Sequence, residues 1–182
     1  MQTKTFSMAG LKFRVLLDSQ DKNEVFRDIL VPDDATFEAF YHSILDSFQF
    51  SGDQMASFYS SNENWDKGQE VSLFDMSFGE DADTPMVMST TQIRELVEEK
   101  EQKFILVHDF MRMWIFLIEL IEYQQETPDR IRMVLSVGNA PSEASKSDEG
   151  ENLQFETESR EGEDEDEFGF NDFEDGYDEF DY

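Results

Sequence analysis

The chain has 182 residues, of which 38% are hydrophobic and 14% aromatic, and its formal net charge is −29. This length fits one domain with an appendage, and the absence of cysteine excludes disulfides, thiolate catalysis and cysteine-ligated zinc. The acidic excess argues against direct binding to nucleic acid or to an anionic membrane, since both need clustered Lys and Arg.

The N-terminal segments predict a strand hairpin followed by a helix. Apolar and charged residues alternate over residues 11–17, which is typical of a half-buried strand. The β-rich residues 25–31 are expected to pair with it and to end at Pro32. Thr36 fits the N-cap of an amphipathic helix over residues 37–48, which we expect Ser51-Gly52 to stop.

A second helix is predicted further along the chain. Residues 89–92 fit the capping-box pattern, and Ile93, Leu96 and Val97 supply a short apolar stripe. We therefore expect a helix of about two to three turns that ends near Lys100.

The apolar stretch over residues 104–121 contains four charged or titratable residues, so buried strands are expected there and a membrane span is not. Residues 114–118 are apolar on both faces, which indicates a central strand. Together the segments predict an α+β domain, with a mixed or antiparallel sheet and two helices in the order ββα–β–αβββ. The expected strands are residues 11–17, 25–31, 55–59, 71–74 (a strand or a turn), 103–110, 113–123 and 130–137.

The composition changes abruptly after Pro141. We expect one domain over residues 1–141 and a disordered acidic tail over residues 142–182. Residues 143–182 carry 2 Lys and Arg against 18 Asp and Glu, a net charge of −16 that opposes collapse. A cytoplasmic location is expected, because the chain lacks cysteine and its first residues lack a signal-peptide pattern.

Several segments resemble the plasmid pRiA4b Orf-three-like family, which is also linked to transposon passengers. The sequence VFRDILVPDD, residues 25–34, resembles the family's W-R-x-I-x-V-P strand, which leads into a helix. The helix that follows falls where the family has a Leu-rich helix with a Leu-His pair. The sequence VHDFMRMW, residues 107–114, resembles its Y-D-F-G-D-x-W strand–turn–strand, and residues 134–143 resemble its final Gly- and Pro-containing segment.

The chain departs from this family pattern at polar positions. Phe26 stands at the family's Trp, Tyr41 at its His, and Met111-Arg112 at its Gly-Asp. The cysteine of the family's C-terminal segment has no counterpart. The family is largely uncharacterised, so the resemblance implies a fold more than an activity.

The sequence offers few groups for catalysis or metal binding, and no metal or cofactor is expected. We interpret His42, beside the apolar helix stripe, as a surface or boundary residue. His108 and Asp109 are neighbours on a strand and point to opposite faces, so a catalytic His–Asp pair would need a partner from elsewhere. The acidic residues 80–83 lack the glycine and distant Glu of an EF-hand, which favours a solvated loop over a cation site.

The most specific candidate for a binding site is a cluster of Asp109, Arg112 and Trp114. They lie at a predicted hairpin turn, where such a cluster could line a pocket for a ligand or substrate. The alternative is an Asp–Arg contact that stabilises the turn.

The acidic tail is the most informative feature of the sequence. Residues 161–182 contain twelve acidic and six aromatic residues. We hypothesise that the aromatic side chains anchor in a protein with a basic or aromatic-accepting surface, while the charges steer the encounter. A solubilising bristle and a nucleic-acid mimic are the alternatives. The aromatic residues are Phe168, Phe170, Phe173, Tyr177, Phe180 and Tyr182.

These observations favour a non-enzymatic protein-interaction module with an acidic, aromatic recruitment tail. The alternative is an enzyme or ligand-binding domain with a pocket near residues 109–114. The sequence specifies neither the partner nor the oligomeric state.

Overall fold

Strands make up most of the computed structural model, which describes residues 10–77 and 85–146. Within these residues, eight strands form one sheet, one α-helix packs beside it, and two short 3₁₀ helices occur in loops. The elements are β1 (Gly10–Leu17), β2 (Phe26–Pro32), α1 (Phe37–Phe48), β3 (Ala56–Ser61), β4 (Glu70–Ser72), β5 (Met86–Val87), η1 (Ile93–Glu95), β6 (Lys103–His108), β7 (Trp114–Gln124), β8 (Arg132–Val137) and η2 (Glu143–Ser145).

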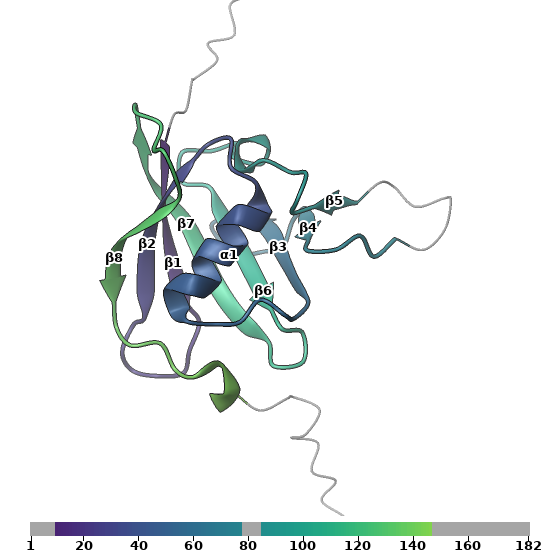
Figure 1. The fold of residues 1–182 in the computed structure, drawn as a ribbon, viewed down its shortest axis with the longest axis vertical. Coiled ribbons are helices and arrows are strands. Elements are labelled where there is room, and N and C mark those ends of the chain that lie inside the picture. The colour runs from purple at the N-terminus through teal and green to yellow at the C-terminus, as the bar shows by residue number, and fades with distance from the viewer. Residues whose placement is uncertain (1–9, 78–84, 147–182) are drawn as a thin grey trace, which may run out of the picture.

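The sheet is built from antiparallel neighbours in the order β5-β4-β3-β6-β7-β1-β2-β8, and only the short β4–β5 pair is parallel. The hairpins β1–β2 and β6–β7 join through β1 and β7. Strand β7 therefore lies inside the sheet, which its apolar residues on both faces predicted. Strands β8 and β5 form the two edges (Figure 1).

Helix α1 covers the concave face of this sheet with one apolar stripe. Its N-cap is Thr36, as predicted, with Oγ1 accepting a hydrogen bond from the Ala39 N–H at 3.2 Å. The helix ends at Phe48, as predicted, and its C-cap is Gln49, whose φ of 61° is left-handed, in place of the Ser51-Gly52 that we expected to stop it. The side chains buried by α1 are Phe37, Phe40, Tyr41, Ile44, Leu45 and Phe48.

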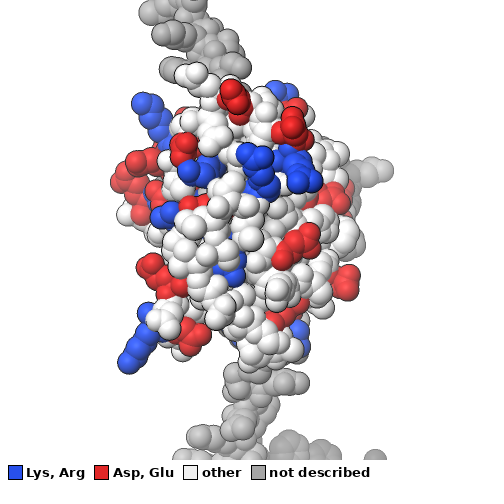
Figure 2. Space-filling model, turned by 60° about the vertical axis from the view of Figure 1, so that its left-hand side comes forward, with Lys and Arg blue, Asp and Glu red and all other residues white. Residues whose placement is uncertain are grey.

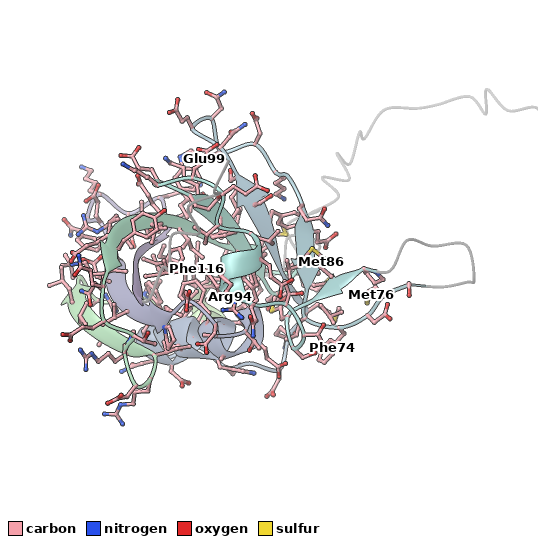
Figure 3. The ribbon with its side chains drawn as sticks, turned by 90° about the horizontal axis from the view of Figure 1, so that it is seen from above. Phe74, Met76, Met86, Arg94, Glu99 and Phe116 are labelled. Atoms are coloured by element: carbon pink, nitrogen blue, oxygen red, sulfur yellow. The ribbon has the colours of Figure 1, made fainter. Side chains whose placement is uncertain are left out.

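Aromatic rings from the helix and the sheet fill the core between them. The Phe13 and Phe40 ring centroids are 5.0 Å apart, and those of Phe37 and Phe58 are 5.1 Å apart. Seen from above, the sheet curls around this interior, where Phe116 lies (Figure 3). Each fully buried side chain of this size stabilises the fold by roughly 1.5–3 kcal/mol.

The predicted helix over residues 89–100 is wrong, because the chain makes only the single 3₁₀ turn η1 there. Two N–H groups of that turn donate to the segment before α1: Ile93 donates to the Ala35 carbonyl and Arg94 to the Asp33 carbonyl. Further on, the Glu98 N–H donates to the Gln102 side chain. The capping contact from the Gln92 N–H to Glu95 lies three residues after the predicted cap, and a Glu98 N–H held by the Gln102 side chain cannot bond the Arg94 carbonyl to continue the turn as an α-helix.

The predicted fold class is corrected accordingly. The order ββα–β–αβββ with two helices is wrong, since the described chain has one α-helix and an eight-stranded mixed sheet. The fold is α+β only in this broader sense. The unexpected strand β5 is two residues long and pairs with β4, and so short a segment has no readable period.

The first residues that we assigned to the tail, 142–146, pack on the domain as η2 and its flanks. The rest of the tail, residues 147–182, lies outside the described residues, and so does the acidic segment 80–83.

Candidate functional site

A chain of hydrogen bonds runs through the core from the helix to the last described turn. Tyr41 of α1 has its hydroxyl 2.9 Å from Nδ1 of His108, the last residue of β6. Nε2 of His108 is 2.9 Å from Oε1 of Glu143 in η2. Tyr41 and His108 are fully buried, and the Glu143 side chain is 16% exposed. Three segments distant in sequence therefore share one buried polar network.

The second carboxylate oxygen of Glu143 connects a fourth segment to the network through a hydrogen bond. The Ser51 N–H donates to Oε2 of Glu143 at 2.7 Å, and the indole N–H of Trp114 donates to the Glu143 carbonyl at 3.2 Å. Lys146 lies over the Trp114 ring at 5.4 Å and donates to the Met113 carbonyl. Residues 143–146 are therefore held against the β6–β7 end of the domain.

Burial and hydrogen bonding shift the pKa values of Glu143 and Tyr41 in this network. Burial opposes ionisation of Glu143, but the hydrogen bonds from Ser51 and His108 outweigh it and hold the pKa of Glu143 below its usual value. Burial, with Glu143 nearby, raises the pKa of the Tyr41 phenol, which stays protonated. A carboxylate only accepts, so Nε2 of His108 donates to Glu143, and the Tyr41 hydroxyl lies within hydrogen-bond distance of Nδ1.

The geometry of His108 favours a structural role. Both ring nitrogens are already bonded within the protein, and the side chain has no exposed surface. A general base must reach the proton that it abstracts, directly or through one water. The network holds elements together, and both ring nitrogens of His108 are used in doing so.

Sequence reasoning did not find this network. Tyr41 belongs to the apolar helix stripe, where a buried aromatic residue is the ordinary expectation. Glu143 lies among the polar residues assigned to the tail. His108 did need a partner from elsewhere in the chain, but no local spacing links it to residues 35 positions later and 67 earlier.

Asp109 shapes the β6–β7 turn. It is 3% exposed and has a φ of 60°, a left-handed conformation that Met113 shares at 54°. Its Oδ1 accepts hydrogen bonds from the N–H groups of Met111 and Arg112, and Oδ2 lies 3.7 Å from Nη1 of Arg112. This arrangement keeps Phe110 and Met111 at the surface, 41% and 60% exposed.

The three predicted pocket residues do not converge on one cavity. Arg112 lines a polar cleft of about 610 Å³ together with Ser51, Gln54 and Glu143. Trp114 packs on Phe50 and borders a different cleft, and Asp109 lines neither. His42, interpreted as a surface or boundary residue, is exposed and lies 3.8 Å from Glu38 on the same helix.

The edge strand β8 carries the longest run of exposed apolar residues in the described chain. Met133, Val134 and Leu135 are 47%, 48% and 44% exposed. Strand β8 pairs with β2 on one side, and no described segment pairs with its other side. Two residues of β8 face one of β2 where the register shifts between Asp28 and Ile29, so Val134 forms a bulge.

The same strand has an unusual charge for this molecule. Residues 130–137, RIRMVLSV, contain two Arg and no acidic residue, whereas the whole chain has a net charge of −29. In Figure 2, several Lys and Arg side chains lie together in the upper part of the face on the β8 side, with Asp and Glu side chains around them and a mostly uncharged area below. Strand β8 is therefore a basic and apolar edge on an acidic protein.

Comparison with known proteins supports the fold without giving an activity. A crystal structure of a protein of unknown function from Methanosarcina mazei Go1 matches with a TM-score of 0.60 at 14% identity, over 78% of this chain and 77% of that one. No curated protein matches the chain. No helix in the described residues is long and apolar enough to cross a membrane.

The sequence pattern of one family covers nearly the whole chain. It matches residues 9–181, a range that includes both the described domain and the acidic tail. This is the family suggested by the resemblance of residues 25–34 and 107–114. The chain belongs to the family described as Plasmid pRiA4b ORF-3-like protein.

Proposed function

We propose that this chain is a non-enzymatic protein-interaction module that receives an extended segment of protein along the free edge of β8. One observation carries the proposal: three consecutive apolar side chains lie exposed on a strand whose outer backbone groups have no partner in the described chain. Such an edge is a ready template for another strand.

The energetics of strand addition fit this surface. Each backbone hydrogen bond gained along an edge contributes a net of about 0.5–1.5 kcal/mol, and the side chains provide specificity. Proteins usually protect an edge with Lys, Pro or a covering loop. Strand β8 contains neither Lys nor Pro, and its protective features are the bulge at Val134 and the single charged residue Arg132. The strand at the opposite edge, β5, is two residues long, which is too short to pair with an added strand over several residues.

The interior network supports a binding role over an enzymatic one. The buried histidine, His108, is engaged at both nitrogens, and Asp109 is engaged in its own turn. Arg112 is the one residue of the predicted pocket that lines the cleft beside Glu143. His108 and Asp109 account for the position of η2 and for the geometry of the β6–β7 turn, so both are engaged within the protein.

The proposal is tested by selecting a displayed library of random extended peptides against the full chain. We expect enriched peptides that bind the wild-type chain and lose at least about tenfold in affinity on Val134→Lys, because an edge Lys obstructs strand addition. Val134 is 48% exposed, so this substitution leaves the fold intact.

Met76→Lys is the matched control. Met76 is 55% exposed and precedes β5 at the other end of the sheet, so peptide affinity should be unchanged. Failure to enrich any peptide would contradict the proposal, and so would peptides that bind the Val134→Lys and wild-type chains equally well.

A further inference from the structure

We infer that the segment that occupies the β8 edge is the chain's own acidic and aromatic tail, residues 161–182. This inference rests on the proposed function, because it names the ligand of the same edge. The tail would act as an internal competitor that a partner protein must displace.

Chemical complementarity carries the assignment. The edge segment 130–137 presents two Arg and an exposed apolar run, so it suits a strand that combines negative charge with large apolar side chains. Residues 161–182 have twelve acidic residues, six aromatic residues and no Lys or Arg. Elsewhere on this acidic protein the tail meets mostly like charge, so the edge is its favoured contact.

The point where the tail leaves the domain makes the contact geometrically feasible. Glu143, Trp114 and Lys146 fix the chain to the β6–β7 end of the domain. Figure 1 shows that η2 lies at the end of the molecule toward which β8 runs. A tail that returns from there along the edge would run antiparallel to β8.

The connecting segment is long enough for this return. Residues 147–160 separate the last described residue from the acidic and aromatic segment. A flexible linker of that length has a root-mean-square span of about 20 Å and reaches at most about 48 Å when extended. Short linkers of this kind give an effective concentration on the order of millimolar, so even a weak contact would be populated.

Because the chain has no cysteine, a single introduced cysteine can carry a spin label at a chosen position. A spin label on the single cysteine of Asn139→Cys, an exposed residue just after β8, should broaden the NMR signals of the Gly169 and Gly176 amides. Adding Val134→Asp, which places a like charge on the edge against the acidic tail, should abolish the broadening, and adding Met76→Asp away from the edge should preserve it. Absence of broadening in the labelled full chain would overturn the inference.

A second copy of the chain is the competing occupant. A mixed sample distinguishes the intramolecular contact from a contact between two copies. In it, one chain carries the spin label but no isotope, and the other carries the isotope but no spin label. Broadening that survives dilution of the labelled chain supports the intramolecular contact, whereas broadening in the mixed sample overturns it in favour of a dimer.

A last measurement separates this inference from the proposed function. A peptide selected against the β8 edge should bind the triple variant Phe168→Ser, Phe170→Ser, Phe173→Ser about tenfold more tightly than the wild-type chain, because the competitor is weakened. Equal affinity would overturn the tail assignment and leave strand addition standing. The spin-label result needs no peptide, so it tests the tail even if the selection fails.

Discussion

At the scale of single residues, the protein satisfies each polar atom of a histidine placed in an aromatic core. His108 is surrounded by the rings of Tyr41 and Phe50, at centroid distances of 5.9 and 6.2 Å. A polar group in such a place costs free energy unless it is hydrogen-bonded. Tyr41 and Glu143 satisfy the two nitrogens, so the histidine becomes a link between elements.

Removing the Tyr41 hydroxyl should expose this dependence. Tyr41→Phe leaves Nδ1 of His108 buried without a partner, and we expect the free energy of unfolding to fall by about 1–3 kcal/mol in chemical denaturation. Tyr59→Phe is the control, since Tyr59 donates a longer, exposed bond of 3.3 Å to Glu70. Its effect should stay within about 0.5 kcal/mol. Equal losses in both variants would refute a special role for the buried bond.

Glu143 should give the stability a defined pH dependence. Its folded-state pKa lies below the unfolded value because Ser51 and His108 stabilise the carboxylate against burial. The contribution is therefore full above the unfolded-state pKa of about 4.3 and is lost as the pH falls through the lower folded-state pKa. Wild type should exceed Glu143→Gln in unfolding free energy at pH 7, and the gap should close in acid. A gap that is constant with pH would contradict this assignment.

At the scale of elements, local sequence patterns predict the secondary structure correctly where no contact with a distant segment opposes it. The predicted strand over residues 11–17 forms as β1, paired with β2 as expected, because alternation suits one buried face. The capping signals at residues 89–92 are instead followed by a single 3₁₀ turn, in which the N–H groups of Arg94 and Ile93 donate to the carbonyls of Asp33 and Ala35. Local preference is weak compared with contacts between segments.

The end of β8 depends on a glycine. Gly138 has a φ of +77°, and a Cβ there would lie 2.7 Å from the Glu24 carbonyl oxygen. We expect Gly138→Ala to lower the unfolding free energy by about 1–3 kcal/mol in thermal or chemical denaturation. At Gly52 a Cβ would meet nothing closer than 3.5 Å, so Gly52→Ala should have little effect. Tolerance of Gly138→Ala would show that this turn can rearrange.

At the scale of the whole molecule, the distribution of charge distinguishes one edge from the rest. The chain has a net charge of −29, yet residues 130–137 carry only positive charges. Opposite charges attract most strongly where they are close and poorly screened. Contact between the tail and β8 should therefore depend on the local Arg residues more than on the total charge.

A charge-reversal pair tests this dependence. Arg130→Glu with Arg132→Glu should reduce the spin-label broadening of the tail, because it removes the basic side chains of the edge. Lys67→Glu with Lys100→Glu changes the net charge by the same amount at exposed sites away from β8 and should leave the broadening unchanged. Equal losses in both double variants would mean that overall repulsion governs the tail.

The sequence by itself determined the features that depend on neighbouring residues. Alternation predicted the first hairpin, the spacing of Phe37, Phe40 and Tyr41 predicted the helix stripe, and apolar residues on both faces placed β7 inside the sheet. Composition alone marks residues 161–182 as acidic and aromatic. These patterns are readable because side chains a few positions apart share a face.

Only the tertiary structure decided which distant groups meet. It joined Tyr41, His108 and Glu143, placed β8 at an edge of the sheet that the described residues form, and replaced the second helix by one turn. Each outcome depends on contacts between segments tens of residues apart, and a local pattern does not encode the position of such partners. The physical reason is that burial and backbone hydrogen bonding are satisfied by the whole fold, and local preferences yield to that requirement.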